Sequence, residues 1–269
     1  MKNEKELAYR YDLFITPDWR DRYDTLINEK VELPAEGHFL DVNSGTGAYA
    51  IELAERLQGK GEVFGTDSSA ERIELSQAKA LVKKTDNVLF EQASATDLPY
   101  RDDRFDAVIG DASMVAPDEI EEMVAELARV ASPGAKVIVK MATRGSFDEF
   151  FSIYWEALLG AGMVDEVWGS LETMINERPT VSDAELLVRR AGLKRVESLS
   201  NIEPFFFDSG NEFLESPLIE DNFLEEWLSI VPENSRQDVY ERLASLIDRE
   251  LHDGPFEVSI KATIITCVK

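Results

Sequence analysis

The stretch Leu40-Asp41-Val42-Asn43-Ser44-Gly45-Thr46-Gly47-Ala48 decides the fold. An apolar run, residues 38–42, leads into it, and residues 48–57 then repeat apolar side chains at helical spacing, which predicts a strand, a tight turn and a helix. Glycines without a Cβ let the backbone bend sharply and let a ligand approach bare peptide, and the start of the helix supplies unpaired N–H donors. The stretch therefore predicts a ligand-binding turn at the carboxyl end of a strand.

A carboxylate at the end of the next predicted strand makes this interpretation more specific. Asp67 lies 22 residues after Gly45 and follows the predicted strand 62–66. A carboxylate in this position can accept hydrogen bonds from both hydroxyls of a ribose. Two alternatives stay open at this point: Asp67 caps the helix that follows it, and Gly45-x-Gly47-x-x-Ala50 is a dinucleotide fingerprint.

Strands and helices alternate through the first half of the chain. We expect strands at 38–42, 62–66, 88–92, 106–110 and 135–141, helices at 48–57, 70–82 and 117–130, and two later strands at 193–200 and 258–268. Strands separated by helices form right-handed crossovers and a parallel sheet that is covered on both faces. The expected fold class is α/β, a doubly wound seven-stranded sheet.

Helical segments interrupt this alternation. We expect helical insertions at about 145–180 and 208–255, which would form a lid, on a Rossmann-like domain spanning residues 31–269. Residues 1–30 are expected to form an N-terminal helical cover.

Composition excludes several classes of partner. The 269 residues include 53 acidic and 28 basic side chains, a formal net charge of −25, which repels phosphate backbones and anionic lipid. We therefore expect no nucleic-acid and no membrane partner. Because no run of about 20 apolar residues and no secretory signal is present, we expect a soluble, cytoplasmic protein. The one cysteine, Cys267, excludes an intramolecular disulfide and a Cys-rich metal site, and we expect it to be a buried structural thiol.

Taken together, these residues resemble the class I S-adenosylmethionine-dependent methyltransferases, in the small-molecule branch called type 11. The matching elements, in family order, are Asp41, the glycines Gly45 and Gly47, Asp67, Leu98-Pro99-Tyr100 running on to Phe105-Asp106, and Arg129-Val130 before Pro133-Gly134. The resemblance is strongest over residues 39–141. It implies that the cofactor is S-adenosylmethionine and that the last strand enters the sheet antiparallel.

The resemblance also implies roles for the residues around the cofactor. Asp41 would face the ammonium of the methionine part, the backbone of Gly45 and Gly47 would contact its sugar and amino-acid portion, and Asp67 would hold the ribose. Asn43 replaces the first glycine of the family's turn, and it tolerates a left-handed backbone better than most residues.

Four further residues complete the predicted cofactor site. Ser68 follows the ribose-binding carboxylate, and Ser94 and Ala95 stand where the family often has an Asp that binds the adenine amine. Asp111 follows the fourth strand, where family members contact both cofactor and acceptor. It is also a candidate helix cap with Ser113, and both interpretations stay open.

The acceptor would be bound by aromatic side chains of the insertions. We expect Phe147, Phe151, Tyr154 and Trp155, helped by residues 205–207 after the sixth strand, to wall an apolar pocket. The alternative is that these rings only pack the lid. Arg20 would suit a carboxylate, although a surface ion pair is expected for it, and His38 and His252 are expected to have no catalytic role.

These observations favour methyl transfer from S-adenosylmethionine to a small, partly apolar acceptor by in-line displacement, a reaction that needs no nucleophile from the protein. Asp111 is the only candidate catalytic residue. Two alternatives remain: a non-catalytic scaffold protein of the same fold, and an NAD-dependent oxidoreductase, which predicts an all-parallel sheet.

Overall fold

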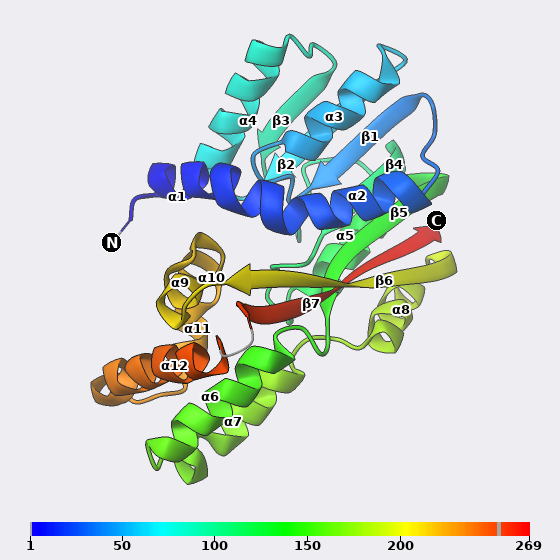
Figure 1. Cartoon of the computed structure of the whole chain (residues 1–269). Helices are drawn as coiled ribbons and strands as arrows, with labels where there is room; N and C mark the ends of the chain where they lie inside the picture. The colour runs from blue at the N-terminus through cyan, green and yellow to red at the C-terminus, as the bar shows by residue number, and fades with distance from the viewer. Residues whose placement is uncertain (1, 252–253) are drawn as a thin grey trace. The chain divides into compact units, whose positions relative to one another are not determined.

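The computed structural model describes residues 2–251 and 254–269, and its backbone follows the predicted alternation (Figure 1). The strands are β1 (Gly37–Val42), β2 (Gly61–Asp67), β3 (Val88–Gln92), β4 (Phe105–Asp111), β5 (Ala131–Thr143), β6 (Lys194–Phe207) and β7 (Phe256–Val268). The first helices after the N-terminal segment are α3 (Ala48–Leu57), α4 (Ala70–Lys83) and α5 (Ile120–Val130). His252 lies outside the described residues.

The strands form one seven-stranded sheet in the order β3-β2-β1-β4-β5-β7-β6. β3, β2, β1, β4 and β5 run parallel to their neighbours, with Asp41 opposite both Gly65 and Ile109. β7 runs antiparallel to β5, because the Lys269 end pairs with Ala135 while the Lys261 end lies at Thr143. The predicted fold class is therefore confirmed, and the all-parallel sheet expected for the oxidoreductase is wrong.

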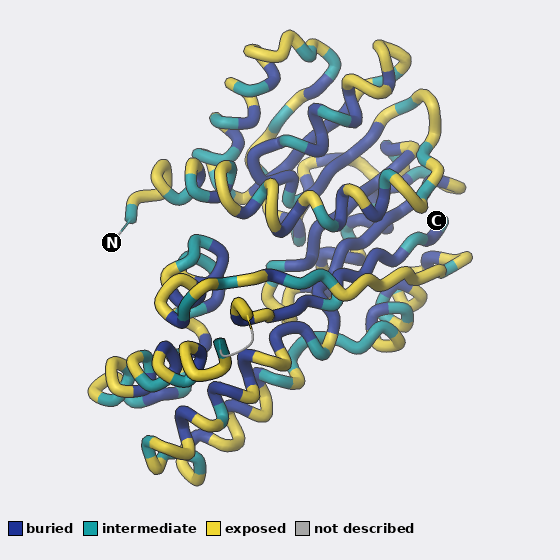
Figure 2. Tube along the Cα trace, in the orientation of Figure 1, coloured by how far each residue is buried: buried dark blue, intermediate teal, exposed yellow. Residues whose placement is uncertain are grey.

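The central strands are buried because they are covered on both faces (Figure 2). All but the first residues of β1 and β2 are buried, and the helix α5 places Met123, Val124 and Leu127 in the core against β4. The carboxyl ends of β1 and β2 are thereby fixed side by side. This rigid edge is where the candidate site lies.

The N-terminal segment is continuously helical. It consists of α1 (Glu4–Arg10), a π-helix (Tyr11–Arg20) and α2 (Asp21–Lys30). Pro17 lies inside the π-helix and has no N–H to donate, and the Asp21 N–H reaches back five residues to the Thr16 carbonyl. π-Helical turns are frequent at functional sites, and this one lies at the carboxyl ends of β1 and β2 (Figure 1).

The chain divides into two compact units. Unit 1 contains residues 1–141, 181–200 and 262–269, and unit 2 contains residues 142–180 and 201–261. Unit 2 holds both predicted helical insertions, as α6 (Asp148–Gly160), α7 (Val164–Asn176), α9 (Gly210–Glu215), α10 (Pro217–Asn222), α11 (Leu224–Ser229) and α12 (Arg236–Glu250). α8 (Val181–Arg190) belongs to unit 1. Among the described residues, no helix has the length and apolar character needed to cross a bilayer.

The observed boundaries differ most from the predicted ones in three elements, α5, β5 and β6. α5 begins at Ile120, three residues later than expected, and β5 already begins at Ala131, where its register against β4 is broken by a bulge. β6 continues to Phe207. The prediction that residues 205–207 follow the sixth strand is therefore wrong, because they form its last three positions.

Candidate functional site

The glycine turn, residues 43–47, joins β1 to α3 in a left-handed conformation. Asn43, Gly45 and Gly47 have φ values of 56°, 58° and 75°. A Cβ on Gly45 would lie 2.7 Å from a ring carbon of Tyr11, so this position requires glycine for space as well as for backbone conformation. The turn thus presents bare peptide at the carboxyl end of the sheet.

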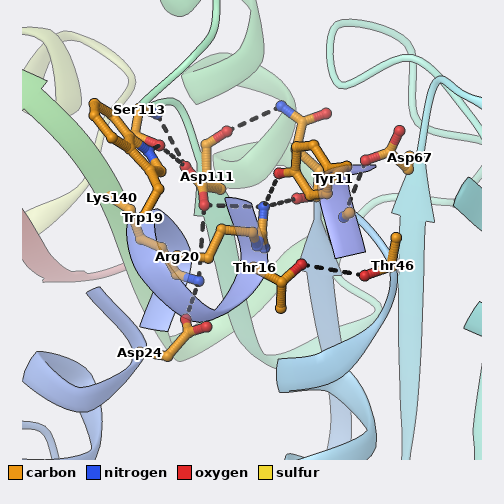
Figure 3. A network of polar contacts seen from close by, with 12 residues as sticks. Tyr11, Thr16, Trp19, Arg20, Asp24, Thr46, Asp67, Asp111, Ser113 and Lys140 are labelled. Atoms are coloured by element: carbon orange, nitrogen blue, oxygen red, sulfur yellow. Dashed lines mark hydrogen bonds and ion pairs between the residues drawn. The ribbon is translucent and has the colours of Figure 1, made fainter. Parts of the chain in front are cut away.

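Asp67 connects the end of β2 to this turn. Its side chain is nearly buried, and Oδ2 accepts a hydrogen bond of 3.0 Å from the Gly45 N–H (Figure 3). Oδ1 accepts a second bond, also 3.0 Å, from the Ser69 N–H. Ser69, which accepts from the Arg72 N–H, is the cap of α4. Asp67 therefore points toward the glycine turn and also supports the start of the helix.

The π-helix lies directly on the glycine turn (Figure 3). The Tyr11 ring packs against Gly45, and the guanidinium carbon of Arg72 lies 3.9 Å from the centre of that ring. The Thr16 and Thr46 hydroxyls are 3.2 Å apart. Tyr11 consequently covers the backbone that the sequence assigns to the cofactor.

Five charged side chains meet beneath this segment, at the ends of β1, β4 and β5. Their side chains are almost completely shielded from solvent, and Asp41 and Lys140 have no exposed surface at all. We call them the buried charge cluster: Arg20, Asp24, Asp41, Asp111 and Lys140. The expectation that Arg20 forms a surface ion pair is wrong, because its Nη1 lies 3.1 Å from Asp111 Oδ2 and only 4% of the residue is exposed.

Three members of the cluster keep buried polar atoms without a hydrogen bond among the described residues, namely Arg20, Asp41 and Asp111, and the Oδ2 of Asp111 faces Arg20 in an ion pair. The two carboxylate oxygens of Asp41 form no hydrogen bond with any residue that the structure describes. The same is true of the Nη2 of Arg20. Arg20 Nη1, in contrast, donates to the Asn43 carbonyl at 2.7 Å. Buried polar atoms normally have partners, so these atoms suit a ligand that carries both a cation and an anion. An α-amino acid has that pair of groups.

Burial and the neighbouring cations act against each other, and the pKa values of Asp41 and Asp111 shift in opposite directions. Burial raises the pKa of Asp41 from 3.8 to about 6, against the lowering effect of Lys140 and Arg20. Burial alone would also raise the pKa of Asp111, but Arg20, Lys140 and the Ser113 hydrogen bonds bring it below its ordinary value. Asp111 is therefore a stable anion, whereas Asp41 is the carboxylate whose charge gains most from a cationic partner.

Asp111 bonds to Ser113 in the loop after β4 but does not cap the following helix, because the cap position of α5 is Glu119, and its role toward cofactor or acceptor stays a prediction. Its Oδ1 accepts from the Ser113 N–H at 3.0 Å and from the Ser113 hydroxyl, to which Trp19 Nε1 also donates at 2.8 Å. Its Oδ2 faces Arg20. The Asn43 amide donates to the Asp111 carbonyl at 3.0 Å, which links the glycine turn to the end of β4.

The predicted adenine-side residues lie beyond β3. Ser94 is exposed and its hydroxyl accepts from the Thr96 N–H, while Ala95 is buried in the core. Ser68 is exposed, and its carbonyl accepts from the Gln92 side chain. The structure thus brings these three residues to the same edge of the sheet as Asp67, since they follow neighbouring strands.

The predicted acceptor residues all lie in unit 2. Phe147, Phe151 and Tyr154 are buried, and their rings pack with those of Phe150, Phe223 and Trp227. Trp155 packs edge-on against Trp168. This mutual packing is what the alternative interpretation expected, and a role in an acceptor pocket stays a prediction.

The two remaining candidates outside the site have ordinary environments. His38 is exposed at the start of β1, at the opposite end of the strand from the glycine turn. Cys267 is buried and donates to the Val137 carbonyl, and burial raises the pKa of its thiol to about 12. A thiol of this kind is inert, as expected for a structural cysteine.

Sequence reasoning missed Asp24 and Lys140. Lys140 did carry a signal, because it is a charged residue inside an otherwise apolar predicted strand. Asp24 carried none, because its partner Lys140 is 116 residues away in the chain.

Comparison with known proteins identifies the family. A family model described as "Methyltransferase domain" matches residues 39–134. Demethylmenaquinone methyltransferase of Lactiplantibacillus plantarum is 37% identical over 111 residues, which are 40% of this chain and 46% of that protein. The enzyme of the same name from Thermus thermophilus is 32% identical over 164 residues, 57% of this chain and 72% of that protein. The chain spans about half the length of several curated relatives that it matches.

A solved structure shares the fold. The YcgJ protein from Bacillus superposes with a TM-score of 0.59 at 19% identity, covering 93% of this chain and 98% of that one. The residues matched by the family model begin in β1 and end in β5, so they include the glycine turn and Asp67. The family-model match and the Thermus thermophilus relative together confirm the resemblance to the methyltransferases that the sequence predicts. The chain therefore belongs to the class I S-adenosylmethionine-dependent methyltransferases.

Proposed function

We propose that this protein transfers a methyl group from S-adenosylmethionine to a small, partly apolar acceptor. The observation that carries the proposal is the hydrogen bond between the Asp67 carboxylate and the Gly45 N–H, at the carboxyl ends of two adjacent parallel strands. Ligands of doubly wound sheets bind at this edge.

The residues present fit the cofactor. Asp67 would hold the ribose hydroxyls, and the backbone of Gly45 and Gly47 would lie against the sugar. Asp41 would receive the ammonium of the methionine part, and Arg20 Nη2 its carboxylate, because both have buried atoms that bond to none of the described residues. Asn43, Ser68, Ser94, Ala95 and Asp111 would complete the site.

When bound, S-adenosylmethionine supplies a methyl group activated on a sulfonium. The protein's residues then have to hold the reactants in line and exclude water, and no side chain has to attack. Asp111 is held as an anion beside Arg20, so it would serve as an electrostatic and positioning group rather than as a proton acceptor.

Tyr11 has to move before the cofactor reaches Gly45. Its ring lies against Gly45 on one side, and the Arg72 guanidinium stacks on the ring. We expect the π-helix to act as the predicted N-terminal cover, opening for cofactor entry and closing over the bound molecule.

The acceptor is proposed from two supports. The relatives are named for demethylmenaquinone, a small organic acceptor. Unit 2 supplies the aromatic residues Phe147, Phe151, Tyr154 and Trp155, which suit an apolar group. The family model ends at residue 134 and does not reach unit 2, so the acceptor needs its own test.

A second candidate function is a non-catalytic scaffold, and the position of Tyr11 favours it, because a permanently closed cover would keep the cofactor out. A turnover assay separates the two. The protein is incubated with methyl-labelled S-adenosylmethionine and a panel of quinols and phenols with and without apolar tails, and labelled product and S-adenosylhomocysteine are quantified. Equal amounts of both products support the transferase. No cofactor binding is what a permanently closed cover requires, so that result contradicts the transferase and favours the scaffold. Cofactor binding without product from any acceptor contradicts the proposed class of acceptor.

A further inference from the structure

Lys140 is a lysine with no exposed surface near the carboxyl end of β5. Its Nζ forms an ion pair with Asp24 of α2 and lies 4.0 Å from Asp111 Oδ2 of β4. It also lies 4.8 Å from the centre of the Tyr49 ring in α3. The neighbouring carboxylates raise the pKa of Lys140 although burial alone would lower it, so this lysine is a cation.

Stability alone does not account for this ion pair. Replacing a buried ion pair by apolar residues of similar size is often neutral or stabilising, because desolvation offsets the attraction between the charges. The neighbours of Lys140 on the same face of β5, Ile138 and Ala142, are buried apolar residues, so an apolar residue would suit this position. The pair is better explained by what its charges do to their neighbours.

Those neighbours are the groups assigned to the amino-acid end of the cofactor. Asp41 is faced by Arg20 from the π-helix, Asp24 from α2, Lys140 from β5 and Asp111 from β4. The cluster has two cations and three carboxylates, so it carries one net negative charge when every group is ionised. That charge complements a cationic ligand.

Removing either partner of the pair changes this balance, in opposite directions. Without Lys140, three carboxylates share a dry site with Arg20 alone, and one of them is driven to take up a proton. Without the Asp24 charge, the cluster is neutral and Asp41 loses its proton more easily. With both partners present, Asp41 is ionised near neutral pH and the cluster carries one net negative charge; loss of a single partner upsets one of these two properties.

We propose that Asp24 and Lys140 are a positioning pair that fixes the ionisation of Asp41 and thereby sets the pH range in which the cofactor binds. This inference rests on the proposed function. It extends that function to Asp24 and Lys140, whose ion pairs lie within the buried charge cluster and to which no direct contact with the cofactor is assigned.

The test is the pH dependence of S-adenosylhomocysteine binding, measured by calorimetry for the full-length wild type, Lys140→Met, Asp24→Asn and the double variant. Proton release on binding is obtained from titrations in two buffers of different ionisation enthalpy. Lys136→Met is the control, because Lys136 lies in the same strand, is partly exposed and bonds to the Glu32 carbonyl.

The expected result has a sign as well as a size. The midpoint of the binding-pH profile should rise by about one pH unit or more in Lys140→Met and fall in Asp24→Asn. The double variant, which restores the charge balance, should return close to the wild type. The control should leave the midpoint unchanged. A purely structural role would weaken binding without moving the midpoint.

The outcomes separate this inference from the proposed function. If the wild type binds no S-adenosylhomocysteine at any pH, the proposed function fails. If the wild type binds and the midpoint is the same in all folded variants, only the inference is overturned. If Lys140→Met does not fold, the other two variants still test the inference. Asp24→Asn must lower the midpoint of the binding-pH profile, and the double variant must leave it close to that of the wild type.

Discussion

Asp41→Asn should stabilise the folded protein, because Asp41 is a buried carboxylate whose oxygens bond to none of the described residues. Burial raises its pKa from 3.8 to about 6 in the folded protein, whereas the unfolded chain keeps the lower value. The folded state therefore holds a proton that the unfolded state releases, and stability falls as pH rises between these values. This pKa change lowers the unfolding free energy by roughly 3 kcal/mol at neutral pH, because Asp41 has to ionise in the folded protein.

The asparagine cannot ionise, so it removes this cost. We expect the variant to exceed the wild type in unfolding free energy by about 3 kcal/mol near pH 8, with the difference vanishing near pH 4. Urea unfolding across this pH range measures it, with Asp118→Asn as the control because Asp118 is exposed. An equal effect at both ends of the range, or a loss of stability near pH 8, would refute the reasoning.

Three further predictions concern other parts of the molecule. Tyr11→Ala should speed the association of S-adenosylhomocysteine severalfold in stopped-flow experiments, because it clears the approach to Gly45. Tyr9→Ala, at an exposed position, should leave the association rate unchanged. An unchanged rate in Tyr11→Ala would show that Tyr11 does not obstruct entry. Phe150→Ala should destabilise unit 2 by about 3–5 kcal/mol in calorimetry, since it opens a cavity beside Trp227, and a loss below about 1 kcal/mol would contradict this packing. Cys267 should resist thiol reagents in the native state and react on unfolding, and rapid native labelling would contradict its burial.

The meeting of Asp67 and the glycine turn could be predicted from the sequence because local rules fix it. Each lies at the end of a strand that the apolar pattern reveals, and parallel neighbours bring their carboxyl ends to one edge. The strand β1 differs from its predicted range by one residue, and β3 by none. The two predicted strand ends therefore place Asp67 beside Gly45, although the two residues are 22 positions apart in the chain.

The buried charge cluster could not be predicted, because its contacts join distant parts of the chain. The partner of Asp24 is 116 residues away, and the partner of Arg20 lies at the end of β4. In a chain with 30% charged residues, nothing local distinguishes a buried arginine from a surface one. The π-helix has the same difficulty, since Pro17 signals an irregular helix without specifying its hydrogen-bond pattern.

The aromatic residues of the first insertion show a different limit. Their helical spacing predicts one apolar face in α6, but an apolar face can line a pocket or pack against other helices. The ring contacts of Phe150 with Phe213 and Trp227 come from segments 60 or more residues later in the chain. The sequence therefore predicts which side of the helix is buried and leaves its neighbours open.

The central claim is that Asp67 and the glycine turn together bind an adenosine, and a calorimetric titration of S-adenosylhomocysteine into the wild type and Asp67→Ala tests it most directly. Loss of the hydrogen bonds from both ribose hydroxyls to a charged acceptor should weaken binding by about 10- to 150-fold. Asp106→Ala, at the opposite end of the sheet, should bind like the wild type. Equal affinity of the wild type and a correctly folded Asp67→Ala would contradict the account.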